Sequence, residues 1–136
     1  MKRFAFAAVV ALALILHSCD LQRYVIPDGY FGWVVVFHDV ASCPPVPRLR
    51  GWKTYRFAPD GTLCTSDPIV GGWMKSEYLY ANGMALVDDR DIWQKSTGEA
   101  TKDGVRHVFV DFFVGSRRQF DTMPRNNRIA PGVTLP

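Results

Sequence analysis

Cysteine is the residue type with the clearest chemistry in this 136-residue sequence, and each of the three cysteines has its own context. Cys19 follows a basic head, an apolar run at 4–16 and the tripeptide Leu16-His17-Ser18. This order is typical of a lipobox, in which the cysteine after a small residue receives a diacylglycerol. The apolar run has thirteen residues, whereas a membrane-spanning helix needs about 20. The run therefore predicts a cleaved signal peptide.

The predicted mature protein begins at Cys19 and carries fatty acids such as palmitate on that residue, which gives a firm membrane anchor. The alternative is ordinary secretion with cleavage after Ala13, which would leave an apolar stub at 14–16. A lipid anchor predicts the bacterial cell envelope, on the periplasmic side of a membrane if the cell is Gram-negative. Asp20 directly after the cysteine favours retention at the inner membrane.

Cys43 and Cys64 remain as an even pair once Cys19 is assigned to lipid. In an exported, oxidised protein such a pair predicts a disulfide. The alternative is two reactive thiols, but neither residue lies in a Cys-x-x-Cys motif or beside a histidine.

The histidines offer little for catalysis. His38-Asp39 ends an apolar run, whereas His107 and Asp111 share one face of a predicted strand about 13 Å apart, too far for a dyad. The acidic cluster at 88–91 lacks the spacing of a calcium loop. We therefore predict no catalytic residue, metal or cofactor. An envelope hydrolase or metal-dependent enzyme that uses His38, Asp39 or His107 is the alternative function.

Aromatic residues are numerous, and two tryptophans beside turns, Trp52 and Trp73, are the candidate binding residues. They would contact an envelope protein or a glycan. Removal of Lys2 and Arg3 with the signal leaves 14 basic against 13 acidic residues, so we predict no nucleic-acid partner.

The elements that would position these residues are short strands. An apolar run at 33–37 predicts a central strand. Alternation at 105–114 predicts a last strand with Phe112 towards the core and Phe113 on a face that is partly wet or covered by loops. Turn residues at 59–61 and 82–83 predict two hairpins, of 53–57 with 62–65 and of 77–80 with 84–87. The polar stretch 88–102 is interrupted by Ile92 and Trp93 and gives no strand prediction. No helix-length apolar period occurs after the signal.

This pattern predicts an all-β fold, an antiparallel β-sandwich of about six to eight short strands. The predicted organisation is a signal peptide at 1–18, a tether at 19–23, the β-sandwich domain at 24–120 and an irregular tail at 121–136.

Two motifs carry a family resemblance, the Ile-Pro-x-Gly-Tyr-x-Gly-Trp-Val sequence at 26–34 and Phe-Phe-Val-Gly at 112–115. With a middle segment at 54–67, they resemble an uncharacterised family of bacterial lipoproteins, a domain of unknown function. The resemblance implies localisation and a single domain and brings no assigned activity. We therefore expect a lipid-anchored envelope module that binds or scaffolds a partner at the membrane surface.

Overall fold

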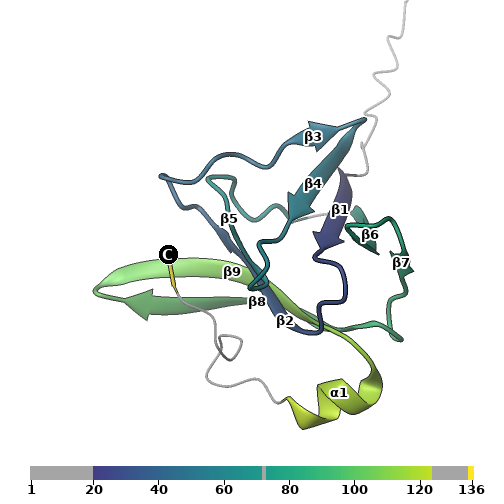
Figure 1. Ribbon diagram of the computed structural model, residues 1–136. Helices are drawn as coiled ribbons and strands as arrows, with labels where there is room; N and C mark the ends of the chain where they lie inside the picture. The colour runs from purple at the N-terminus through teal and green to yellow at the C-terminus, as the bar shows by residue number, and fades with distance from the viewer. Residues whose placement is uncertain (1–19, 72, 124–134) are drawn as a thin grey trace, which may run out of the picture.

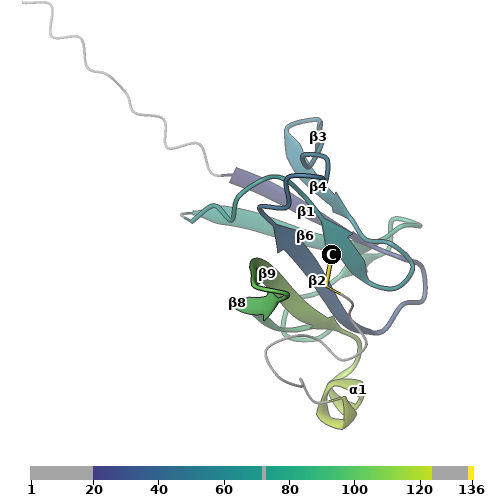
Figure 2. The ribbon, with the colours of Figure 1, turned by 90° about the vertical axis from the view of Figure 1, so that its left-hand side faces the viewer.

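The computed structural model describes residues 20–71, 73–123 and 135–136, which fold into two packed β-sheets with one short helix (Figure 1). The first sheet has the strand order β3-β4-β1-β6-β7, and the second has the order β5-β2-β9-β8. Figure 2, turned by 90°, shows the two layers from the side. The predicted all-β sandwich is confirmed.

Both sheets are mixed rather than purely antiparallel. In the first sheet, β1 (Asp20–Ile26) lies between β4 (Trp52–Arg56) and β6 (Met74–Tyr80) and is parallel to both. Two short edge strands complete this sheet in antiparallel pairing, β3 (Arg48–Leu49) and β7 (Ala85–Leu86). The β6–β7 hairpin confirms the turn predicted at 82–83.

The second sheet contains the strand that is buried along its whole length. This strand, β2 (Gly32–His38), pairs in parallel with β5 (Thr62–Cys64) and antiparallel with β9 (Val105–Val114). All seven residues of β2 are buried, as expected for a central strand. The edge strand β8 (Ile92–Lys102) pairs with β9 through a hairpin.

The predicted hairpin of 53–57 with 62–65 is wrong, because the turn between these segments carries the chain from one sheet to the other. β4 lies in the first sheet and β5 in the second. Gly61 makes the crossing with φ +82°, and a Cβ there would collide with the Tyr30 hydroxyl group. The same hydroxyl donates to the Trp33 carbonyl oxygen at 2.6 Å, which fastens the crossing to β2. Local turn chemistry predicted the bend but not the partner of each strand.

The polar stretch 88–102, where no strand was predicted, contains the eleven-residue strand β8. Its polar residues reflect its position, since β8 is at an edge of the sheet and most of its side chains are partly or fully exposed. A register shift between Trp93 and Ser96 also interrupts the alternation from which a strand would be predicted.

A row of tyrosine rings forms the centre of the first sheet's inner face. Tyr24 stacks on Tyr55 at 4.9 Å and on Tyr78 at 5.2 Å between ring centroids. Phe112, fully buried on the facing sheet, meets the Tyr24 ring edge-on at 5.3 Å. The predicted core face of β9 is thereby confirmed.

The other face of β9 is also buried around Phe113, and a helix covers it, whereas the prediction was a face partly wet or covered by loops. Phe113 is fully buried against Trp33 and Phe120, with ring centroids 5.6 Å away in each case. Phe120 belongs to α1 (Arg117–Thr122), the short helix that closes this side of the sheet. Asp111 on the same face is fully buried and accepts a hydrogen bond from the Ser96 hydroxyl at 2.9 Å.

The two ends of β1 mark two opposite ends of the sandwich. Residues 20–23, predicted to be a tether, are the first half of β1, so the domain begins directly at Asp20. We call this the proximal end. Seven residues later, about 20 Å along the strand, the chain reaches the distal end, where Phe31 and the start of α1 lie. Figure 1 shows β1 starting in the upper part of the molecule and α1 below.

Candidate functional site

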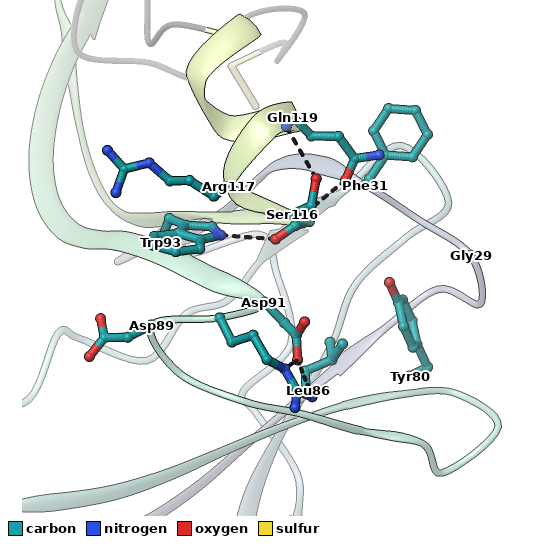
Figure 3. A pocket seen from close by; sticks show the side chains of 12 residues that line it. Gly29, Phe31, Tyr80, Leu86, Asp89, Asp91, Trp93, Ser116, Arg117 and Gln119 are labelled. Atoms are coloured by element: carbon teal, nitrogen blue, oxygen red, sulfur yellow. Dashed lines mark hydrogen bonds and ion pairs between the residues drawn. The ribbon is translucent and has the colours of Figure 1, made fainter.

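A pocket of about 560 Å³ opens at the distal end of the sandwich (Figure 3). Its volume is in the range of small-molecule sites. Segments from four regions meet here: the β1–β2 loop, the end of β6 with β7, the loop before β8, and the start of α1. The lining side chains are aromatic, charged and amide groups: Phe31, Tyr80, Leu86, Asp89, Arg90, Asp91, Trp93, Ser116, Arg117 and Gln119.

Three aromatic rings frame the distal pocket. Trp93 and Tyr80 lie across an open space from one another, and Phe31 lies near Gln119 at the rim (Figure 3). Phe31 is 55 % exposed. The other two rings are held in place, since the Tyr80 hydroxyl donates to the Tyr30 carbonyl oxygen at 3.1 Å and the Trp93 Nε1–H donates to the Gly115 carbonyl oxygen at 2.9 Å.

A fixed carboxylate lies on the opposite rim. Asp91 Oδ2 accepts hydrogen bonds from the Val87 N–H at 2.9 Å and from the Arg90 guanidinium at 2.9 and 3.2 Å. Partial burial raises the pKa of Asp91, but these hydrogen bonds and the Arg90 charge outweigh it and lower the pKa overall. Asp91 is therefore an ionised hydrogen-bond acceptor at neutral pH.

The start of α1 supplies the third side of the pocket. Ser116 and Gln119 form a capping box, in which the Gln119 N–H donates to Ser116 Oγ at 3.2 Å and the Ser116 N–H donates to Gln119 Oε1 at 2.8 Å. The Arg117 guanidinium lies over the Trp93 ring at 5.4 Å and binds Asp121 through Nε at 3.0 Å. The positions of Trp93 and Arg117 are thus fixed by α1, whose own position depends on Phe120 packing under the sheet.

A second pocket, of about 250 Å³, lies between the sheets and includes Val70 and Met74 of the proximal end in its lining. Next to it, the Lys95 ammonium lies 4.6 Å from the Tyr24 ring centroid and donates to Ser76 Oγ at 3.3 Å. Although part of the Lys95 side chain is exposed, burial of its ammonium lowers the pKa to about 8. Burial also raises the pKa of Tyr55, which lines this pocket, to about 12. Lys95 thus makes cation–π contacts with Tyr24 and Tyr78 at the margin of the core.

The residues of the catalytic alternative are not brought together. His38 is 5 % exposed on the inner face of β2, where Nδ1 lies 3.1 Å from the Asp67 carbonyl oxygen and burial lowers the pKa of the ring. Val108 is the β9 residue that pairs with His38. His107 is its neighbour along β9, so the His107 side chain lies on the other face of the sheet, near Phe37. Within 20–71, 73–123 and 135–136, no three His, Cys, Asp or Glu side chains are grouped to hold a metal.

Cys43 and Cys64 form a disulfide in the structure, with their Cα atoms 5.8 Å apart. The bridge joins the proline-rich segment at 44–47 to β5, beside the end of β2. This pairing agrees with the prediction from the even number of remaining cysteines.

The three other predicted site residues have different positions. Cys19 lies outside the described residues. Trp52 is only half-buried, but its ring is covered by the Arg23 guanidinium at 4.9 Å. Trp73 is 89 % exposed at the proximal end. Neither tryptophan lines the distal pocket.

Sequence reasoning missed the distal pocket. Its residues come from turns and strand ends that no spacing rule connects, and Trp93 lay in a polar stretch where no strand was predicted. The Ser116-x-x-Gln119 capping pattern was a usable sign of a fixed helix start after the last strand. It did not indicate which loops would face that helix.

Among the described residues, no helix is long and apolar enough to cross a membrane. No curated protein matches the chain. A crystal structure of a "Putative Lipoprotein" from Bacillus anthracis is similar in fold, with a TM-score of 0.59 and 24 % sequence identity over 85 % of this chain and 80 % of that one.

A family model matches residues 20–122, a range that contains β1 to α1 and both of the motifs noted above. The match spans the two sheets, the disulfide and the distal pocket, and it covers more than half of the chain. The chain therefore belongs to the family of unknown function DUF6843.

Proposed function

We propose that this protein is a lipid-anchored binding module of the bacterial cell envelope, and that its distal pocket binds a saccharide unit of an envelope glycan. The anchoring part is supported by the lipobox that ends at Cys19 and by the similarity in fold to the Bacillus anthracis protein. The binding part depends on one observation, the open distal pocket with aromatic faces and fixed polar groups.

The side chains of the distal pocket suit a sugar ring. Exposed aromatic faces such as Phe31 and Tyr80 can stack on the C–H faces of a pyranose, which are apolar. The ionised Asp91 can accept hydrogen bonds from hydroxyl groups, and the amide of Gln119 can exchange them. Both arginines of the pocket already pair within the protein, Arg90 with Asp91 and Arg117 with Asp121, so the pocket does not demand an anionic ligand.

The catalytic alternative has no comparable support. Its two histidines lie on opposite faces of one sheet, and neither lines the distal pocket. We therefore place binding rather than hydrolysis at this site.

The test is a binding titration of the full-length protein with soluble fragments of envelope polysaccharides, including peptidoglycan fragments, by calorimetry. Phe31→Ala should weaken binding about tenfold, because an exposed stacking ring contributes roughly 1–2 kcal/mol and its loss leaves the fold intact. Trp73→Ala is the matched control, since it removes an exposed aromatic ring outside the pocket.

Equal loss of affinity in both variants, or no binding of any fragment by the wild type, would overturn the saccharide proposal. Arg117→Gln gives a second measure, because it changes a pocket residue that is largely exposed. We expect it to weaken binding while the melting temperature stays near that of the wild type.

A further inference from the structure

Four exposed apolar side chains gather at the proximal end of the sandwich. Trp73 is 89 % exposed, and Leu49, Val70 and Met74 are between 39 and 49 % exposed. A tryptophan so exposed is uncommon in a folded domain, because leaving its large apolar ring in water is unfavourable. Trp33 of the same protein, by comparison, is only 3 % exposed.

This group lies beside the first residue of the domain. The Asp20 N–H donates to the Trp73 carbonyl oxygen at 3.3 Å, and Asp20 pairs with Met74 in the β1–β6 register. The β3–β4 turn lies at the same end. β4 runs parallel to β1 with Lys53 opposite Gln22, so the turn residues just before Lys53 lie level with the start of β1. Leu49 belongs to that turn region.

Cys19 is the residue directly before Asp20, and neighbouring Cα atoms are about 3.8 Å apart. Since β1 begins at Asp20, no tether separates the lipidation position from the folded domain. Because Trp73 is hydrogen-bonded to Asp20, a lipid on Cys19 would hold Trp73 close to the bilayer surface. This step rests on the proposed lipid anchor.

Basic side chains surround the apolar group. Arg48, Arg50 and Lys75 are exposed at this end. The nearby carboxylate of Asp20 is already paired with Arg48, through a 3.1 Å contact to Nη2. Tryptophan with flanking lysine and arginine is the composition that membrane–water interfaces favour, and the basic groups add attraction to anionic headgroups.

We propose that the proximal end is a membrane-contact surface, in which Trp73 enters the interface of the leaflet that holds the Cys19 lipid and Arg50 and Lys75 contact anionic headgroups. The occupant of the apolar surface is thus the bilayer itself. This contact fixes the orientation of the domain, with the distal pocket directed away from the membrane.

The experiment uses the full-length acylated protein reconstituted in phosphatidylcholine vesicles that contain phosphatidylglycerol and a lipid brominated on its acyl chain. Bromine quenches tryptophan fluorescence only at short range. We expect strong quenching of the wild type and loss of most of it in Trp73→Phe. Trp52→Phe is the matched control and should keep the wild-type quenching, because its ring is covered by Arg23.

Vesicle flotation, measured in the same samples, separates this proposal from the proposed anchor. If the wild type does not float with vesicles, the lipid anchor fails and so does the contact that rests on it. If the protein floats but brominated lipid leaves its fluorescence unchanged, or quenches wild type and Trp73→Phe equally, the membrane contact alone is overturned. Shielding of Trp73 that depends on protein concentration and not on lipid would instead assign the surface to a second copy of this chain, which also overturns the proposal.

Discussion

The two ends of the sandwich expose aromatic rings in different ways. At the distal end, Tyr80 and Trp93 are held by hydrogen bonds to backbone carbonyl groups and surround a pocket. At the proximal end, Trp73 is 89 % exposed near basic side chains. A fixed, concave arrangement suits a small ligand of defined shape, whereas an exposed ring beside lysine and arginine suits a fluid interface.

The difference teaches that exposure alone does not identify a binding site in this protein. The most exposed tryptophan is the one next to the predicted lipid position, and the pocket rings are more buried than Trp73. What separates the two ends is whether the surrounding residues fix the ring. The following four predictions, from the largest expected effect to the smallest, test this comparison of the two ends.

The largest expected effect comes from Cys19→Ser. Without the thiol no lipid can be attached, so we expect complete loss of the protein from the membrane fraction and loss of fatty-acid labelling. Affinity at the distal pocket should be unchanged, because Asp20, the residue that follows Cys19 in the sequence, lies at the other end. Membrane partitioning equal to that of the wild type would contradict the lipid anchor.

Phe112→Ala should lower the free energy of unfolding by about 3–5 kcal/mol, because the ring is fully buried between the sheets against three aromatic neighbours. Phe113→Ala should cost a similar amount. It should also weaken the distal pocket, because Phe113 packs against the Phe120 ring of α1.

Urea unfolding followed by ligand titration of the folded fraction checks both variants. If Phe113→Ala leaves pocket affinity at the wild-type level, α1 does not depend on this packing for its position. If Phe112→Ala lowers pocket affinity more than Phe113→Ala does, then Phe112 and not Phe113 supports the distal pocket.

Replacing both bridge cysteines, Cys43→Ala with Cys64→Ala, should lower the free energy of unfolding by about 3 kcal/mol, because a loop with a sequence separation of 21 is no longer closed in the unfolded chain. Binding at the distal pocket should be retained, since no pocket residue touches the bridge. Denaturant unfolding with and without reductant measures the effect, and reductant should destabilise only the wild type.

The smallest effect concerns pH. Burial lowers the pKa of His38 in the folded protein, so the unfolded chain binds the proton more readily. Stability should therefore fall as pH decreases below about 6.5, the ordinary histidine pKa, and the loss should level off below the lowered pKa. His38→Gln should flatten this dependence, measured by urea unfolding at several pH values.

Much of the local structure could be predicted from the sequence. Alternation at 105–114 gave the correct inner face of β9, because side chains of a strand point alternately to its two sides wherever the strand lies. The Asn82-Gly83 turn predicted its hairpin for the same reason, as its backbone conformation is a property of those two residues. The disulfide was predicted from the even number of cysteines that remain once Cys19 is assigned to lipid.

Only the tertiary structure decided which strands pair and which surfaces are covered. β4 and β5 are joined by a tight turn yet belong to different sheets, because the choice of partner depends on strands distant in sequence. Phe113 is buried because α1, a later element, packs over it. The distal pocket likewise needs four separate segments to meet, and long-range packing of this kind leaves no period or spacing in the sequence.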